Sequence, residues 1–496
     1  MMEGQRIRVD MRSLFRWTWL WMLIQYASSG GVEDTEARLI LDVTDFGAIG
    51  DGIQEDTLAI REALSQATLL TRLEEEETFT QRSPSVTVYF PKDRVFVSAP
   101  LNLSSNVILH VDGTLRAITN ATSGIDFDES WPQLPPLPSY GNSEDNNRYL
   151  QYQAFLYASE ATNIVIQGEG TIDTQGAWWW DAFRNRPSTL PAGRPNLLQF
   201  VNCSNIEITG VTMKDSPFWT IHPVYCTDVH IHHIKIRAPL YAPNVDGIDP
   251  DSSRNVLIEF NDVSCGDDHI AIKAGRCGDG STSIDSINCL TDDHFRLGSY
   301  ITSNITIRYN IFRTGMGIAL GSELSGGIEY VNAYQNIIGL CEHGHDSPER
   351  SCGWGHAIHL KTTLTRSGFL RHLQFYDNTI YNNTGFLFLE TDYQDNKHKL
   401  PPNFPTTKIQ NISIRGNSGL GMAVGVTLGC SNYLQCNQIQ VKDNWILHGT
   451  SANYFCSYVH SYHVENNFPA GLEACMYESM NRTEPLLFSA KTINNE

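Results

Sequence analysis

The sequence lacks the features of several large classes of protein. No uninterrupted apolar run approaches the ~20 residues of a membrane-spanning helix, which excludes a multi-pass membrane protein. Basic residues are scarce, with 35 Lys and Arg against 55 Asp and Glu and a formal net charge of −20. This balance argues against a nucleic-acid-binding protein, which needs a basic face. Gly and Pro are not in excess, so the chain is neither collagen-like nor disordered.

The first thirty residues differ from the rest of the chain. Four arginines precede an apolar stretch at residues 17–24, and small residues follow at 27–30. This order is the layout of a secretory signal peptide, which we place at residues 1–30. The alternative is an uncleaved signal anchor, for which the apolar stretch is short. We therefore expect a secreted protein, located outside the cell or in the cell wall and not bound to a membrane once the signal is removed.

Cysteines and glycosylation sequons agree with export. The chain has 11 cysteines and seven N-x-[ST] sequons. Connectivity cannot be read from sequence, but short separations favour some pairs over others. The candidates are Cys277–Cys289, Cys341–Cys352, Cys430–Cys436 and Cys456–Cys475, with Cys203–Cys226 a fifth possibility that leaves Cys265 unpaired.

A short pattern repeats along the chain: Asn or Asp, followed by two apolar residues that straddle a third. It begins at Asn106, Asn163, Asn205, Asp228, Asn255, Asn304 and Asn411. Short β-branched strands at such spacing, with few helical stretches, predict a solenoid whose stacked coils share one core. The alternative is an ordinary β-sandwich with chance spacing. We predict an all-β, right-handed parallel β-helix.

The ends of such a stack need covers. Residues 57–71 have helical apolar spacing and could form a short helix that caps the N-terminal end. The repeat is lost after Val441. We therefore expect the β-helix domain at residues 31–445 and a C-terminal cap or tail at 446–496.

The densest group of acidic residues lies at 244–275. Asp246 and Asp267 are 21 residues apart, about one coil, so they should lie on neighbouring strands ~4.8 Å apart. Asp268 can face the same cleft if the backbone bends at Gly266. Close carboxylates repel, so one should hold a proton and serve as an acid beside an ionised base, as glycoside hydrolysis requires. The alternatives are a calcium loop or an Asp/Asn ladder with a purely structural role.

Longer motifs resemble a known family. DVTDFGAIGDGIQEDTLAI (42–60), GTIDTQGAWWW (170–180) and SPFWTIHPVYC (216–226) are similar to motifs of glycoside hydrolase family 28, the polygalacturonases and related pectin hydrolases. The resemblance implies a pectin-lyase-like right-handed β-helix that hydrolyses a pectic polysaccharide with inversion. It also implies that no metal or other cofactor takes part.

The family motifs carry over to particular residues. Asn-x-Asp falls on Asn244 and Asp246, and Gly-Asp-Asp falls on Gly266, Asp267 and Asp268. The resemblance implies that Asp267 is the general acid, while Asp246 and Asp268 position and deprotonate the attacking water. Inversion needs the acid and base ~6.5–9.5 Å apart, which side chains on adjacent strands can reach.

Two positions depart from the family pattern. Met316, in Gly315-Met316-Gly317, stands where the family has a histidine, and His359-Leu360-Lys361 stands where it has Arg-x-Lys. The family uses the latter motif to hold the substrate carboxylate. Lys361 is retained, but a histidine binds a carboxylate only when protonated, whereas an arginine binds at any pH.

Other residues could compensate or add contacts. Lys273 and Arg366, with Lys361 and Arg276, could make the cleft locally basic in an otherwise acidic protein. A packed or solvated role is the more ordinary expectation for His269, and Trp178, Trp179 and Trp180 could be either a sugar platform or core. His343 and His345 match no strong zinc pattern, and we expect no metal.

The leading hypothesis is a secreted, monomeric hydrolase of the α-galacturonosyl linkages of pectin. A second hypothesis assigns the same chemistry to rhamnogalacturonan or xylogalacturonan. A third is a β-helix that binds polysaccharide with little or no turnover because of Met316. The sequence does not distinguish endo from exo action, because loops at the ends of the cleft decide it.

Overall fold

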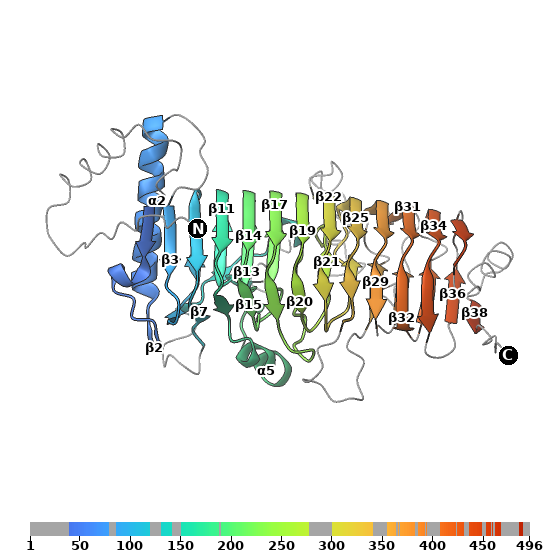
Figure 1. Ribbon diagram of the computed structural model, residues 1–496, viewed down its shortest axis with the longest axis horizontal. Coiled ribbons are helices and arrows are strands. Elements are labelled where there is room, and N and C mark those ends of the chain that lie inside the picture. Colours follow the sequence, from blue (N-terminus) through green and yellow to red (C-terminus); the bar gives the residue numbers. More distant parts are fainter. Residues whose placement is uncertain are drawn as a thin grey trace, which may run out of the picture.

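The computed structural model describes most of the chain. The described residues are 39–78, 86–119, 130–140, 150–187, 190–276, 300–340, 355–363, 366, 368–381, 385–391, 393, 407–422, 424–430, 436–448, 453–457, 459, 462–467 and 486–489. They form an elongated stack of parallel strands, with the N-terminal and C-terminal coils at opposite ends (Figure 1). The predicted right-handed parallel β-helix is confirmed. The predicted signal peptide lies outside the described residues.

Three long faces run along the stack, and we call one level of it a rung. The 13-stranded sheet, sheet A, has the strands β1 (Leu39–Asp42), β3 (Val86–Phe90), β6 (Val107–Val111), β11 (Thr162–Gln167), β14 (Ser204–Thr209), β17 (Thr227–His232), β19 (Arg254–Glu259), β22 (Ile301–Arg308), β25 (Gly327–Tyr334), β28 (Phe369–Tyr376), β31 (Lys408–Arg415), β34 (Cys436–Lys442) and β37 (Tyr462–Glu465).

The second face is the 12-stranded sheet B. Its strands are β2 (Asp51–Glu55), β4 (Val95–Ser98), β7 (Thr114–Ala117), β12 (Thr171–Asp173), β15 (Thr212–Lys214), β18 (Lys235–Arg237), β20 (Asp262–Ser264), β23 (Ile311–Phe312), β26 (Ile337–Ile338), β29 (Thr379–Tyr381), β32 (Ser418–Met422) and β35 (Trp445–His448).

The third face, face C, is split into two sheets. The N-terminal sheet contains β5 (Leu101–Asn102), β10 (Leu156–Ser159), β13 (Leu198–Val201) and β16 (Ile221–Val224). The C-terminal sheet contains β21 (Ile270–Ile272), β24 (Ile318–Leu320), β27 (His356–Lys361), β30 (Gly385–Glu390), β33 (Val424–Gly429), β36 (Asn453–Ser457) and the antiparallel β38 (Leu486–Ser489). The rung between β16 and β21 makes only isolated bridges.

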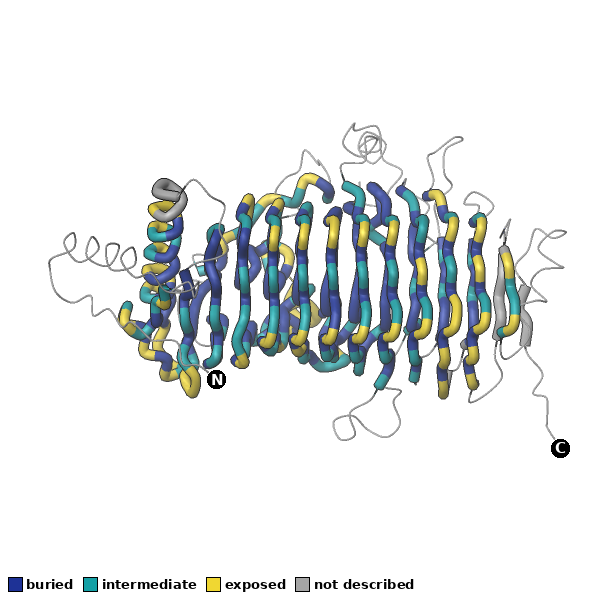
Figure 2. The backbone as a smooth tube through the Cα atoms, turned by 45° about the horizontal axis from the view of Figure 1, so that its top comes forward, coloured by how far each residue is buried: buried dark blue, intermediate teal, exposed yellow. Residues whose placement is uncertain are grey.

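One continuous apolar core fills the stack. Alternate residues of each strand point inward, and successive strands are in register, as in Ile206 beside Val229 and Val229 beside Val256. Figure 2 shows the resulting alternation of buried and exposed positions along the strands. Each coil alone would leave its apolar face in water, so stacking is what stabilises it.

The sequence repeat has a conformational cause. Its Asn or Asp residues lie where the chain enters sheet A and adopt positive φ angles, such as 58° at Asn163 and 53° at Asn205. Asn and Asp tolerate this left-handed conformation better than other residues with a Cβ. Their side chains also bond from rung to rung, with Asn205 Nδ2 2.7 Å from Asn163 Oδ1.

A second, buried asparagine ladder lies in the turn between sheets A and B. Each amide donates to the side-chain oxygen of the next asparagine at 2.8–3.0 Å. That oxygen also accepts the backbone N–H of the preceding residue in the ladder. We define the asparagine ladder as Asn261, Asn310, Asn336, Asn378, Asn417 and Asn444.

The predicted N-terminal capping helix is confirmed and is longer than predicted. Helix α2 (Thr57–Thr78) follows the short helix η1 (Val43–Phe46) and packs against the first strands of sheets A and B. In Figure 1 it stands at the N-terminal end of the stack. Of the helices in the described part of the chain, none combines the length and apolar character needed to cross a membrane.

Parallel stacking continues past residue 445. β36 pairs with β33, and β37 pairs with β34. The rungs therefore reach further than the visible sequence repeat, which ends near Val441. The division at residue 445 stays a prediction.

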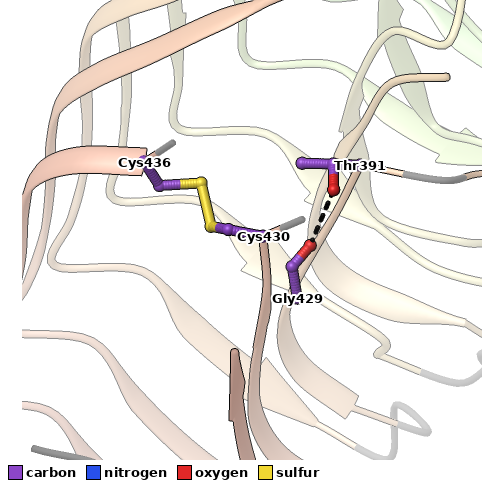
Figure 3. The surroundings of a disulfide bond; sticks show 4 residues. All are labelled: Thr391, Gly429, Cys430 and Cys436. Atoms are coloured by element: carbon purple, nitrogen blue, oxygen red, sulfur yellow. Dashed lines mark hydrogen bonds between the residues drawn. A yellow bond between two sulfur atoms is a disulfide. The ribbon is translucent and has the colours of Figure 1, made fainter. Parts of the chain in front are cut away.

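The cysteines give a mixed outcome. The predicted Cys430–Cys436 disulfide is present and links the end of β33 to the start of β34 (Figure 3). The pairing of Cys203 with Cys226 is wrong: both are free and buried, and their thiols lie 3.4 Å from the carbonyl oxygens of Val201 and Val224. Cys265 is also free, as expected. The other predicted pairs involve residues outside the described ones.

Candidate active site

The acidic residues lie where face C is interrupted. Ile248 bridges Ile221 on one side and Ile270 on the other, and it points into the core. Asp251 similarly bridges Val224 and Lys273. This rung therefore contributes Ile248 to the core, while residues that face away from the core, such as Asp251, supply carboxylates on the outer side of face C.

The next rung carries Asp267 and Asp268 in a bend. A Cβ on Gly266 would lie 2.0 Å from the carbonyl oxygen of Ala242, so only glycine permits this close approach. The N–H groups of Gly266 and Asp267 both donate to Val245 O at 3.2 Å. The N–H of Asp268 donates to Asp267 Oδ1 at 3.0 Å. The bend expected from the sequence lets both side chains join Asp246, one rung away.

Crowding and burial alter the acidity of these groups. Burial, together with the charges of Asp246 and Asp268, raises the pKa of Asp267 well above its ordinary value. Burial and the neighbouring Asp249 raise the pKa of Asp246. Burial raises the pKa of Asp249 to about 7. We call Asp246, Asp249, Asp267 and Asp268 the aspartate cluster. Asp246, Asp249 and Asp267 hold protons to a higher pH than isolated aspartates do.

Lys273 lies among the carboxylates. Its Nζ is 3.5 Å from Asp246 Oδ2, 3.4 Å from Asp249 Oδ1 and 3.4 Å from Glu323 Oε2. The ammonium also lies 4.1 Å from the centre of the Trp219 ring. Burial opposes its charge, but the surrounding carboxylates outweigh burial and raise the pKa of Lys273. Lys273 therefore compensates the cluster and is not a free cation on the surface.

Lys361 pairs with the third aspartate. Its Nζ lies 2.7 Å from Asp268 Oδ2, and the Tyr393 ring centre is 5.2 Å from the same nitrogen. Although burial opposes the charge, Asp268 raises the pKa of Lys361. The other carboxylate oxygen, Asp268 Oδ1, has no hydrogen-bond partner among the described residues. That oxygen is buried and, among the described residues, no side chain or backbone group donates a hydrogen bond to it.

Asn244 is held by an arginine that the sequence motifs did not indicate. Arg194 Nη2 donates to Asn244 Oδ1 at 2.9 Å, and Nη1 donates to the carbonyls of Pro217 and Pro243. The guanidinium also lies over the ring of Phe183 at 4.1 Å. Burial lowers the pKa of Arg194 to about 10. Nothing near position 194 in the sequence marks it, because its partners are 23–50 residues away.

Met316 lies beside the cluster, and its N–H donates to Asp267 O at 2.9 Å. His269 is buried in the structural role that we expected. Its Nδ1 accepts from Gly317 N–H at 2.9 Å, and its Nε2 donates to Thr314 O at 3.0 Å. Burial lowers the pKa of His269 to about 4. This histidine therefore does not replace the one that Met316 displaces.

His359 makes a hydrogen bond to a carboxylate within the protein. Its Nε2 lies 2.7 Å from Glu390 Oε1, and its ring stacks on Phe388. Arg366 is buried, and its Nε donates to Ser322 O at 3.3 Å. The structure thus gathers the predicted residues on face C, but His359 already has a carboxylate partner.

Two of the three tryptophans take a core role, and Trp178 is partly buried against the core. In helix α5 (Ala177–Asn185), Trp179 and Trp180 are buried, and Trp179 packs edge-on against Trp131 and Tyr152.

Among the described residues, no group of three or more His, Cys, Asp or Glu side chains is placed to hold a metal ion. The arrangement that is present can supply a proton and accept one, with Asp267 half-buried at the surface of the site.

Comparisons with known proteins agree with this chemistry. The family model described as Glycosyl hydrolases family 28 matches residues 82–466. The chain is 30% identical over 380 residues to a probable polygalacturonase of Vitis vinifera, covering 75% of this chain and 67% of the relative. It is 34% identical over 245 residues to an endo-polygalacturonase of Pectobacterium carotovorum, covering 47% of this chain and 52% of that one.

A solved structure shares the fold over nearly the whole chain. The exopolygalacturonase of Thermotoga maritima superposes with a TM-score of 0.64 at 22% identity. The match covers 91% of this chain and 94% of that protein.

Proposed function

This chain belongs to glycoside hydrolase family 28, and on that premise we propose that it hydrolyses the α-galacturonosyl linkages of pectin with inversion. The observation that carries the proposal is the state of Asp267. It is a half-buried carboxyl group whose pKa is raised well above its ordinary value, and it lies in the rung beside Asp246. A carboxyl that keeps its proton is what departure of a glycosidic oxygen requires.

In the proposed reaction, Asp267 donates its proton to the glycosidic oxygen as the bond to the anomeric carbon breaks. Water attacks that carbon from the opposite face, and Asp268, with Asp246, accepts the proton that the water loses. Asp268 Oδ1 suits this role because no described residue donates a hydrogen bond to it. The glycosidic C–O bond breaks and a C–O bond to water forms, while Asp267 loses one proton and the base carboxylate gains one. Proton exchange with solvent then restores the starting protonation states.

The two lysines have distinct supporting parts in this proposal. Lys361 holds Asp268 Oδ2 at 2.7 Å and so orients its free oxygen. Lys273 contacts Asp246 and Asp249 and offsets their mutual repulsion. Both contacts keep carboxylates close together in a buried site, where unpaired charges would be costly.

The cluster favours catalysis over simple binding of polysaccharide. Asp249 is fully buried; its Oδ1 lies 3.4 Å from Lys273 Nζ, but among the described residues neither of its oxygens makes a hydrogen bond of regular geometry. Such a group destabilises the fold, and perturbed carboxyls of this kind gather at catalytic sites. A binding surface would not need them, which supports turnover despite Met316.

A second candidate is a hydrolase of another pectic linkage, and the pair between His359 and Glu390 favours it. The family pattern places an arginine for the substrate carboxylate at position 359. Here the histidine is already paired at 2.7 Å, and Glu390 adds a negative charge. A galacturonate carboxylate at this position would meet repulsion that a neutral sugar would not.

We further propose that the protein is secreted, since the first thirty residues have the layout of a signal peptide. Among the sequons, Asn304 and Asn411 are exposed on sheet A, so glycans there would not cover face C.

The test is release of reducing sugar by the secreted protein from polygalacturonate, rhamnogalacturonan and xylogalacturonan between about pH 4 and pH 7. We expect release from polygalacturonate. Release only from one of the other two substrates would establish the second candidate. No release from any of them, with retained polysaccharide binding, would show a binding protein and overturn both enzymatic proposals.

The substrate carboxylate can be tested separately with the double variant His359→Arg, Glu390→Gln. We expect its KM for polygalacturonate to fall several-fold, because an arginine fork binds carboxylate and the repelling charge is removed. An unchanged KM, with normal folding, would show that position 359 does not face the substrate carboxylate.

A further inference from the structure

The outer side of face C differs in exposure on the two sides of the aspartate cluster. On the N-terminal side, Gln199 is 5% exposed, and His222 and Asp251 are 1% and 0% exposed. These polar residues occupy outward positions, where a solenoid normally meets water. Something in the chain must therefore cover them.

The cover includes a proline-rich segment, residues 133–140, which we call the proline strap. It begins as β8 (Gln133–Leu134), which pairs with β9 (Gln151–Tyr152) just before β10. It ends in the short helix η2 (Pro138–Tyr140), where Tyr140 Oη donates to Asp251 Oδ2 at 2.5 Å. The strap therefore starts at the rung of β10 and ends at the rung of the cluster.

The length of the strap fits a path along the solenoid axis. From the rung of β10 to that of Asp251, the strap passes β13 and β16, which is three spacings of ~4.8 Å or about 14 Å. From Leu134, four extended steps of ~3.1 Å and two helical steps of ~2.0 Å within η2 reach ~16 Å. Three prolines lie within the strap, so it is stiff as well as long enough.

The end of the strap is fastened on both sides. Ser139 N–H donates to Tyr225 Oη at 2.8 Å, and Tyr225 Oη donates to Ser139 Oγ at 2.6 Å. Ser139 O accepts the N–H of Arg276 at 2.7 Å. Asp251 Oδ1 accepts the N–H of Gly275 at 3.0 Å. The strap is thus tied to the rungs before and after Asp251.

The buried polar groups on the N-terminal side of the cluster satisfy one another. Gln199 Nε2 donates to His222 Nδ1 at 3.0 Å, and His222 Nε2 lies 3.4 Å from Asp251 Oδ2. Burial and the charge of Asp251 raise the pKa of Tyr140 well above its ordinary value, so it stays a donor. Sugar hydroxyls would find these hydrogen-bonding groups already used.

On the C-terminal side, the outward groups are partly open. The side chains of His359, Glu390 and Glu323 are 14%, 19% and 19% exposed. A polysaccharide can therefore contact the site over β27 and β30 but meets the strap on the opposite side.

We propose that the proline strap closes the substrate path on the N-terminal side of the aspartate cluster, so that the enzyme acts from a chain end. This rests on the proposed hydrolysis of a pectic chain. A sugar chain that runs along the axis must end near Trp219 and Tyr140, which lie 6.5 Å apart between ring centres. Only the last few sugars then fit beyond the scissile bond, and short products of uniform length are released.

The experiment follows polygalacturonate digestion by product chromatography and viscometry in the same samples. We expect one short product, a monosaccharide or disaccharide, from the first minutes, with viscosity falling slowly relative to reducing ends. A ladder of longer oligomers with an early collapse of viscosity would overturn the inference while leaving the hydrolase itself established. Absence of reducing sugar from every pectic substrate would instead overturn the proposed function and, with it, the inference.

A variant tests the strap itself. Tyr140→Ala with Tyr225→Phe removes the bond to Asp251 and both side-chain contacts to Ser139. We expect the share of products longer than three sugars to rise at least several-fold. The control is Tyr330→Ala on sheet A, an exposed tyrosine outside the site, which should leave the product pattern unchanged. An unchanged pattern in a folded double variant would show that the strap does not limit the substrate.

Discussion

The asparagine ladder and the aspartate cluster are both groups of largely buried polar side chains, but they differ in how well their polar atoms are paired. In the ladder, each amide bonds to the next at 2.8–3.0 Å, and backbone groups share the same oxygens. In the cluster, Asp249 has no hydrogen bond of regular geometry from a described residue, and lysines must offset the repulsion. The ladder therefore stabilises the folded β-helix, whereas the cluster destabilises it.

This difference shows where a functional site is expected in a fold built from repeats. A solenoid satisfies its polar groups by repetition, since the same residue on the next rung is always a partner. The cluster breaks that repetition at the rung between β16 and β21, where face C loses its regular strand pairing. Carboxylates crowded at such a position are costly to folding but are poised to transfer protons.

The largest expected effect is on turnover when Asp267 is changed. Asp267→Asn should lower kcat on the active pectic substrate by about 10²–10⁴-fold, because the proton donor is lost. The melting temperature should be unchanged or higher, because one repelling carboxylate is removed. Kinetics with matched thermal scans check this, and retention of most of the activity would contradict the assignment of the acid.

A substitution in the asparagine ladder should have the opposite effect and lower stability while leaving turnover unchanged. Asn336→Ala removes the acceptor of two buried donors of Asn310, its backbone N–H and its Nδ2. Each unsatisfied group costs about 1–3 kcal/mol, so we expect a loss of about 3 kcal/mol in the free energy of unfolding. The kcat should stay near that of the unchanged protein. Urea unfolding measures the loss, with Thr306→Ala in β22 as a control. Equal losses of stability in both variants would show that the ladder asparagine stabilises the fold no more than an ordinary strand residue does.

A smaller effect concerns the pH dependence of stability. The folded pKa of Asp249 is about 7, raised by burial, whereas an unfolded aspartate ionises near 3.9. Its contribution is therefore fully present below about pH 4 and is lost as the pH rises towards 7. Asp249→Asn should reduce the fall in melting temperature over this range by a few degrees, since each pKa unit corresponds to about 1.4 kcal/mol. An unaltered slope would mean that Asp249 ionises normally in the folded protein.

The fold was predictable because its signal is local. The residues that begin each strand of sheet A, such as Asn163 and Asn205, must accept positive φ, and that requirement shows in the sequence. The asparagine ladder could not be predicted from the sequence because loops of unequal length lie between its members. Successive asparagines are 49, 26, 42, 39 and 27 residues apart. A period that varies this much does not register as a repeat.

The site was predictable only in part. The three aspartates stand in short motifs, and one coil of separation brings them together. Arg194 and Tyr140 could not be found this way, because their partners Asn244 and Asp251 are 50 and 111 residues distant. The same holds for Glu390, whose pairing with His359 depends on strand register and not on any motif.

The most direct test of the central claim is the configuration of the first product. If Asp267 protonates the leaving oxygen while Asp268 and Asp246 activate water, an α-linked galacturonate must be released as the β-anomer. Proton NMR during the first minutes of digestion, before the anomers equilibrate, distinguishes the two forms. Early β-anomer is the predicted result. Early α-anomer would require a covalent intermediate on one of the aspartates and would contradict the proposed roles.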